Sequence, residues 1–167
     1  MNDPAAGNNE CTKEIFMANV QVGIVYGSPS DESVMKECAA VLDEFGVAYE
    51  MNAMSAHRTP GTVADYASSA AGRGLRVLIA GAGLAAHLAG AVAAHTILPV
   101  IGVPLDAGSL GGLDALLATV QMPKGVPVAT VAIGKHGARN AAYLAVQILA
   151  LNDATLTEQL AKRKEKS

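Results

Sequence analysis

The chain has 167 residues, which is enough for one domain with a sizeable buried core. It carries 12 Lys and Arg residues against 15 Asp and Glu residues, a formal net charge of -3, which argues against nucleic acid or an anionic membrane surface as a partner. Its two cysteines, Cys11 and Cys38, form no CxxC pair and follow no secretion signal, so we expect reduced thiols, no disulfide and a cytoplasmic location.

Residues 1–18 mix charged residues with Asn and Gly and hold no apolar segment, so we expect a flexible tail. Residues 19–167 are then a single α/β domain that ends in helices. The β-branched run 20–26 predicts a first strand, and an apolar stripe predicts a helix over about 30–45. Gly46 is placed to end that helix.

The next unit repeats this order. Residues 49–53 predict a weaker strand, and Pro60 opens a helix at a position where its missing N–H is tolerated. That helix is expected to run to about Arg73. A strand follows at 77–80.

The run 77–105 contains no Asp, Glu, Lys or Arg and resembles a membrane span in hydropathy. Its glycines and prolines divide it into a strand, a helix over about 85–95 and a strand at 100–103, and His87 and His95 would be unfavourable in lipid. We therefore expect no membrane association. A helix this rich in Ala and Gly also suggests burial between subunits.

The remainder predicts one more strand at 128–133 and helices at about 112–120, 138–151 and 154–164. Strands that alternate with helices are typical of crossover units on a parallel sheet. We therefore expect a three-layer αβα sandwich, flavodoxin- or Rossmann-like, with about five parallel strands.

Ligands of such sheets bind beyond the carboxyl ends of the strands, where loops meet helix N-termini. The loop after the first strand, residues 27–31, offers two hydroxyls from Ser28 and Ser30 and the carboxylate of Asp31. A sugar hydroxyl suits Asp31 better than a phosphate does, because two anions repel. The alternative is that Ser30 or Asp31 only caps the following helix.

The loop after the second strand places His57 beside Arg58. An imidazole can carry a proton near neutral pH, and a guanidinium can hold two phosphate oxygens. This pair therefore indicates proton transfer on an anionic substrate. The alternative is a hydrogen-bonded core imidazole beside a surface cation.

The third loop, residues 81–88, lacks bulky side chains before its helix, so a flat ligand could approach the backbone of Ala82 and Gly83. The alternative is ordinary packing between strand and helix, with His87 as a structural donor. The first loop, residues 27–31, is neither a GxGxxG nor a P-loop pattern, so dinucleotide and ATP binding lack support there. No GxSxG or HExxH pattern occurs, so serine-hydrolase and metal chemistry lack support as well. Acid–base chemistry remains.

Together these loops resemble the N5-carboxyaminoimidazole ribonucleotide mutase family. The resemblance covers about residues 20–151 and rests on several segments in one order: GSPSD at 27–31, SAHRTP at 55–60, IAGAGLAAHL at 79–88, LPVIGVP at 98–104, VQMP at 120–123 and GVPV at 125–128. It implies a step of de novo purine biosynthesis in which a carboxyl group moves from an exocyclic nitrogen to C4 of an imidazole. It also implies a homo-octamer with active sites near subunit contacts, and no cofactor.

The resemblance further implies roles for single residues. His57 would be the general acid and base in a closed site where the substrate loses and regains CO2. The ribonucleotide would contact Ser28, Asp31, Ala56 and Arg58, with phosphate contacts from Ser30 and Ser55, while Ala82, Gly83, His87 and Leu88 would face the imidazole and the migrating carboxylate. Many members have Gly in place of Leu84 and Pro in place of Ala89.

Two other functions stay open. A related carboxylase uses free CO2, but its members typically have Lys in place of Arg58 and a Ser-Asn pair in the third loop, where this chain has an AAHL segment. A non-catalytic nucleotide-binding module could use the same fold.

Overall fold

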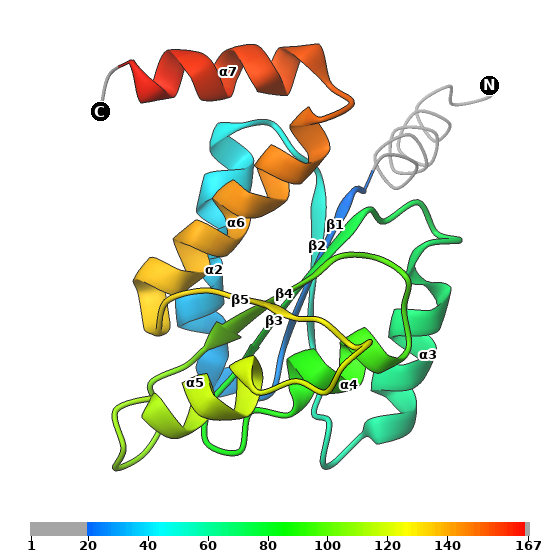
Figure 1. Ribbon diagram of the computed structural model, residues 1–167, viewed down its shortest axis with the longest axis vertical. Helices are drawn as coiled ribbons and strands as arrows, with labels where there is room; N and C mark the ends of the chain where they lie inside the picture. The colour runs from blue at the N-terminus through cyan, green and yellow to red at the C-terminus, as the bar shows by residue number, and fades with distance from the viewer. Residues whose placement is uncertain (1–19, 166–167) are drawn as a thin grey trace, which may run out of the picture.

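The computed structural model describes residues 20–165. A parallel sheet with the strand order β2-β1-β3-β4-β5 lies at its centre (Figure 1). The strands are β1 (Val22–Tyr26), β2 (Tyr49–Ala53), β3 (Val77–Ala82), β4 (Val100–Pro104) and β5 (Ala129–Thr130). The three central strands consist almost wholly of buried apolar residues, because helices cover both of their faces. β2 is an edge strand and is only half-buried, which accounts for its weaker sequence signal.

Helices α2 (Glu32–Glu44) and α6 (Gly134–Ala150) cover one face of the sheet, and α3 (Pro60–Ala70), α4 (Leu88–Ala94) and α5 (Leu113–Val120) cover the other (Figure 1). A short 3₁₀ helix, η1 (Pro29–Asp31), precedes α2, and α7 (Ala154–Lys164) packs against α6. The predicted three-layer αβα fold with five parallel strands is confirmed, and its strand order is that of flavodoxin-like sheets.

The apolar run 77–105 divides into β3, α4 and β4, as predicted. Between residues 20 and 165, no helix is both long enough and apolar enough to cross a membrane. The tail predicted for residues 1–18 lies outside the described residues.

Several elements differ in extent from the prediction; α3, for example, ends at Ala70 instead of at about Arg73. β5 pairs only with β4, so it keeps two residues, Ala129–Thr130, where 128–133 was expected. α4 begins at Leu88, three residues later than expected, because the preceding residues form a tight turn. α6 begins four residues earlier, at Gly134, since its first turn packs against the segment that follows β5.

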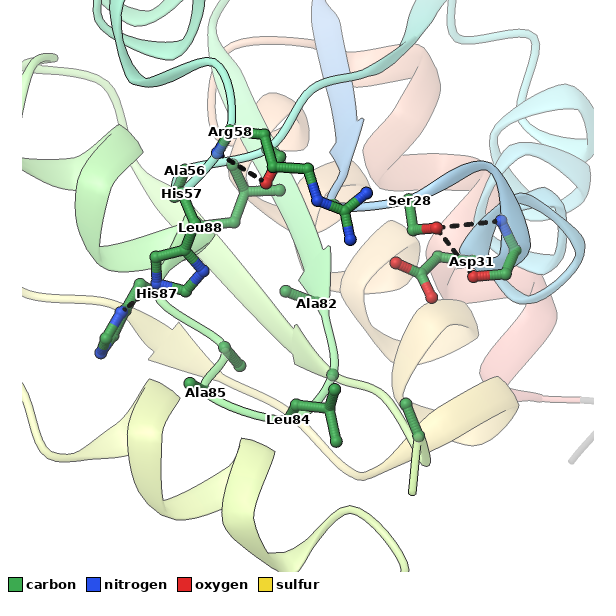
Figure 2. A pocket seen from close by; sticks show the side chains of 16 residues that line it. Ser28, Asp31, Ala56, His57, Arg58, Ala82, Leu84, Ala85, His87 and Leu88 are labelled. Atoms are coloured by element: carbon green, nitrogen blue, oxygen red, sulfur yellow. Dashed lines mark hydrogen bonds between the residues drawn. The ribbon is translucent and has the colours of Figure 1, made fainter.

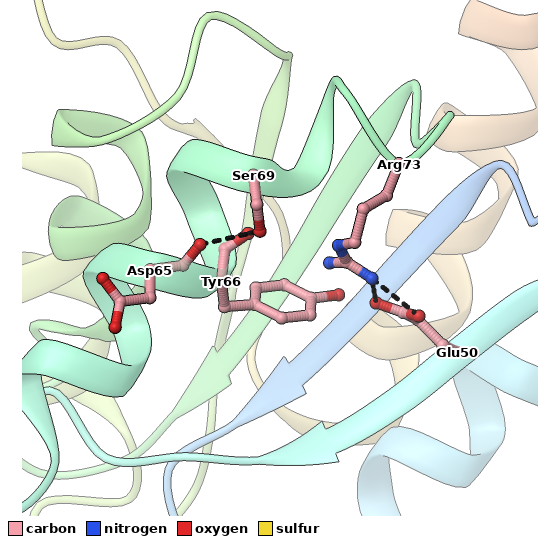
Figure 3. Close-up of polar contacts among 5 residues, drawn as sticks. All are labelled: Glu50, Asp65, Tyr66, Ser69 and Arg73. Carbon is pink, nitrogen blue, oxygen red and sulfur yellow. Dashed lines mark hydrogen bonds and ion pairs between the residues drawn. The ribbon is translucent and has the colours of Figure 1, made fainter.

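A polar cluster fixes α3 near the amino end of the sheet, opposite the loops discussed below (Figure 3). Nη1 of Arg73 donates to both carboxylate oxygens of Glu50 on β2, at 2.8 and 3.0 Å, and its guanidinium carbon lies 4.7 Å from the centre of the Tyr66 ring. The Tyr66 hydroxyl lies directly over Gly23 of β1, where any side chain would collide with it. Burial, reinforced by the Glu50 carboxylate, raises the pKa of Tyr66. The cluster therefore ties α3 to both β1 and β2.

The thiol of Cys38 lies buried on α2 and is free, and burial raises its pKa to about 12. The thiolate is the reactive form, so we expect no reaction of Cys38 with a thiol reagent at pH 8 while the protein is folded. Cys11 lies outside the described residues, so the measurement uses a Cys11→Ser variant. One thiol should react after denaturation and none before; rapid labelling of the folded variant would contradict the placement.

Candidate active site

The loops that follow β1, β2, β3 and β4 meet at the carboxyl edge of the sheet and enclose a cavity of about 400 Å³. The chain order switches direction between β1 and β3, which is where ligands bind in open α/β sheets. The cavity volume is within the usual range for small-molecule sites. Every site residue named from the sequence lines it: Ser28, Ser30, Asp31, Ser55, Ala56, His57, Arg58, Ala82, Gly83, His87 and Leu88.

The loop after β1 presents hydroxyls at the start of a helix. Ser28 caps η1: its Oγ accepts from the Ser30 hydroxyl at 2.9 Å and from the Ser30 N–H at 3.4 Å. Asp31 makes no side-chain capping bond to α2, so the alternative that Ser30 or Asp31 supplies the cap is wrong. Burial raises the pKa of the Asp31 carboxyl, although hydrogen bonds from Ser28 and Ser30 lower it in part. Asp31 lines the cavity, where its carboxylate can also meet a ligand.

The turn after β2 is held by two side chains at its ends. The Ser55 N–H donates to Thr59 Oγ1 at 3.1 Å, and Thr59 donates back to the Ser55 carbonyl from both its hydroxyl and its N–H. Ser55 Oγ accepts from the Arg58 N–H at 3.2 Å. Pro60 then starts α3. These bonds leave the side chains of His57 and Arg58 free to project into the cavity, and Arg58 extends across it toward Ser28 (Figure 2).

His57 and His87 form a pair that the sequence did not predict, because their positions are 30 residues apart. His57 Nε2 lies 2.6 Å from His87 Nδ1, and the rings meet edge-on with their centres 4.8 Å apart (Figure 2). At this distance the two nitrogens share one proton, which one ring donates and the other accepts. His57 Nε2 is therefore engaged, and Nδ1 is the nitrogen that can serve a ligand. The alternative of a core imidazole is wrong, since His57 is exposed at the cavity.

The loop after β3 forms an apolar wall of the cavity. Ala82, Ala85, Ala86 and Leu88 line it together with Leu84. Ala82 and Gly83 line the cavity as expected, and neither carries a side chain longer than a methyl group that would cover its backbone.

Ala107, in the loop after β4, lines the same cavity and was missed by sequence reasoning. It touches the third loop closely, because a Cβ on Gly83 would lie 2.5 Å from the Cβ of Ala107. The sequence signal that could have identified Ala107 is its position just beyond a buried strand, which is also where the other three loops begin.

Arg58 is the one Lys or Arg among the residues that line the cavity. Within residues 20–165, no group of three or more His, Cys, Asp or Glu side chains is arranged to hold a metal ion. The cavity thus combines one cation, one carboxylate, several hydroxyls and a histidine pair with an apolar wall. Such a site can hold a polar, phosphorylated ligand at one end and exchange protons with it at the other.

The chain resembles proteins of known sequence over most of its length. It is 57% identical over 137 residues to the N5-carboxyaminoimidazole ribonucleotide mutase of Vibrio parahaemolyticus, covering 82% of this chain and 85% of that protein. The mutase of Bacillus subtilis is 55% identical over 86% of this chain and 89% of its own length. The phosphoribosylaminoimidazole carboxylase of Schizosaccharomyces pombe is 60% identical over 77% of this chain, but over only 23% of its own length.

A solved structure and a family model agree with these relatives. The crystal structure of PurE from Treponema denticola superposes with a TM-score of 0.78 at 29% identity, covering 87% of this chain and 90% of that one. The family model described as AIR carboxylase matches residues 21–167. The chain therefore belongs to the AIR carboxylase family.

Proposed function

We propose that this protein is an N5-carboxyaminoimidazole ribonucleotide mutase of de novo purine biosynthesis. The observation that carries the proposal is the cavity in which the His57–His87 pair lies beside Arg58 and faces an apolar wall of small residues. The mutases of V. parahaemolyticus and B. subtilis, similar to this chain over most of its length, support the choice of substrate. Residues 19–167 form the catalytic domain of this proposal, which we place in the cytoplasm with the purine intermediates.

The polar side chains of the cavity contact different parts of the ribonucleotide. Arg58 pairs with the anionic part of the substrate, because it is the cation at the cavity and can hold two oxygens at once. The Asp31 carboxylate accepts from a ribose hydroxyl. Ser28, Ser30 and Ser55, whose hydroxyls bond within their own loops, add hydroxyls near the phosphate.

The reaction moves one carboxyl group and one proton. The carbamate N–C bond breaks and releases CO2 together with aminoimidazole ribonucleotide, whose electron-rich C4 then forms a C–C bond to the same CO2. The exocyclic nitrogen gains a proton as the N–C bond breaks, and C4 loses its proton after the C–C bond has formed. The apolar wall keeps CO2 near C4, so proximity replaces chemical activation of the gas. No ATP, biotin or metal enters this scheme.

His57 performs both proton transfers through Nδ1. When His87 Nδ1 donates to His57 Nε2, the His57 Nδ1 carries a proton and can act as an acid. When His57 Nε2 donates instead, Nδ1 is a base. The shared proton moves to His57 Nε2 as His57 Nδ1 gives its own proton to the exocyclic nitrogen, and it returns to His87 Nδ1 as His57 Nδ1 accepts the proton that C4 loses. The 2.6 Å separation is short enough for that transfer.

The test is an assay with substrate labelled in the N-carboxylate and supplied without ATP or bicarbonate. Labelled product under these conditions supports the mutase. Turnover only of aminoimidazole ribonucleotide with added CO2 would identify the carboxylase, the activity named for the S. pombe relative. Binding without any turnover would identify a nucleotide-binding module and refute an enzyme.

We propose further that the protein is a homo-octamer. Four of the large exposed apolar side chains gather on α5 and just before it, at Leu110, Leu113, Leu117 and Val120. Leu113, Leu117 and Val120 share one face of α5, opposite the buried Ala115 and Thr119. The helix expected to be buried both within the domain and between subunits, α4, buries its large side chains in the domain core. An apolar stripe of this kind is typical of a subunit contact.

Sedimentation velocity tests the assembly. We expect the wild-type protein to sediment as eight chains and the double variant Leu113→Asp, Leu117→Asp to dissociate, because two carboxylates buried in an apolar contact lack partners. Leu151→Asp, at a position 81% exposed outside this face, should leave the octamer intact. A wild-type protein that sediments as a stable monomer would contradict the proposal.

A further inference from the structure

Leu84 adopts a backbone conformation that suits glycine. Its φ is +54°, and it is the one residue other than glycine with a positive φ between residues 20 and 165. In this region the Cβ of an L-residue crowds its own backbone. The Ala86 N–H donates to the Leu84 carbonyl at 2.9 Å, which holds the tight turn. The chain therefore keeps a side chain at a place where glycine would fit without strain, and such outliers point to a role for that side chain.

The Leu84 side chain lies at a seam between two loops. It is 56% exposed, yet it lines the cavity (Figure 2). A Cβ on Gly108, in the loop after β4, would lie only 2.7 Å from Leu84 Cδ2, so the two residues touch. Next to them Gly83 touches Ala107, which also lines the cavity. The loops after β3 and β4 thus meet at two neighbouring points, and Leu84 forms one of them.

We propose that Leu84 closes this seam and retains the released CO2 during turnover, an inference that rests on the proposed mutase function. CO2 is small and uncharged, so polar contacts do not hold it and its escape depends on gaps in the wall. A branched apolar side chain over the seam removes one such gap. Leu84 is therefore a residue that determines how much CO2 is recaptured, and it takes no part in the proton transfers.

The experiment compares Leu84→Gly and Leu84→Ala with the wild-type protein. The substrate carries ¹³C in its N-carboxylate, the solution holds unlabelled bicarbonate and carbonic anhydrase, and the fraction of product that retains the label is measured. We expect the fraction of label lost to rise about tenfold in both variants. The loss of an apolar contact lowers the discrimination of an enzyme pocket by about 10–200-fold, and we take the lower end of that range. The KM should change little, because the nucleotide contacts remain.

Two controls separate this role from a structural one. Leu84→Gly should melt no lower than the wild-type protein, since glycine accepts the positive φ. Leu151→Ala, the same type of change at an exposed position outside the cavity, should retain label as the wild-type protein does. Equal retention in all four proteins would overturn the role of Leu84 and leave the mutase function standing. A wild-type protein with no turnover would refute the proposed function itself.

Discussion

His57→Asn is expected to abolish turnover of the carbamate substrate while nucleotide affinity stays nearly unchanged. An amide has a shape similar to that of imidazole but cannot carry a proton between C4 and the exocyclic nitrogen. General acid–base catalysis by a positioned side chain typically contributes about 10²–10⁴-fold, so kcat should fall by at least that factor. The measurement is kcat from the labelled-substrate assay, together with the Kd of a non-reacting ribonucleotide by calorimetry.

Arg58→Ala is the matched comparison, because Arg58 is the next residue in the same turn and lines the same cavity. It should chiefly raise Kd, since its guanidinium binds the anionic part of the substrate and touches no reacting bond. Both side chains are exposed, so neither substitution should disturb the core. If both variants lost affinity equally and kept a residual rate, the division of roles between His57 and Arg58 would be wrong.

The sheet was predictable because its central strands are short apolar runs set off by glycine and proline. β2 and α7 have the predicted bounds, Tyr49–Ala53 and Ala154–Lys164. The start of α6 was not predictable, since Gly134 and Gly137 are poor helix formers and only the packing of its first turn makes that turn helical. The end of β5 likewise depends on how far β4 can pair with it.

The candidate site was predictable as far as each loop could be assigned to the end of a parallel strand. This reasoning placed the residues around Ser28, His57 and Gly83 at one edge, and the structure brings them to one cavity. It could not find the bond between His57 and His87, because a distance of 2.6 Å between two loops depends on their tertiary arrangement. The contact between Leu84 and Gly108 is of the same kind.

Gly137→Ala is expected to cause the largest loss of stability among single substitutions of small residues. Gly137 is buried in the first turn of α6, and a Cβ there would overlap the backbone carbonyl of Ala132. A neighbouring side chain could rotate away from the added Cβ. The Ala132 carbonyl cannot, because it is part of the backbone that joins β5 to α6. Either that segment or the first turn of α6 must move, and α6 packs along α2. Overpacking costs about 1–3 kcal/mol, and the upper end applies because backbone must shift.

Such a loss lowers Tm by roughly 6–12 °C for a chain of this size. The measurement is thermal unfolding by circular dichroism at one chain concentration, because assembly makes Tm depend on concentration. Gly61→Ala is the matched control: Gly61 lies in the first turn of α3, with nothing within 4 Å of an added Cβ. It should raise stability slightly, by about 0.4–1 kcal/mol, because alanine restricts the unfolded chain. Should Gly137→Ala melt at the wild-type temperature, the close packing of α6 against Ala132 would be wrong, and with it the reason that this helix begins before Ala138.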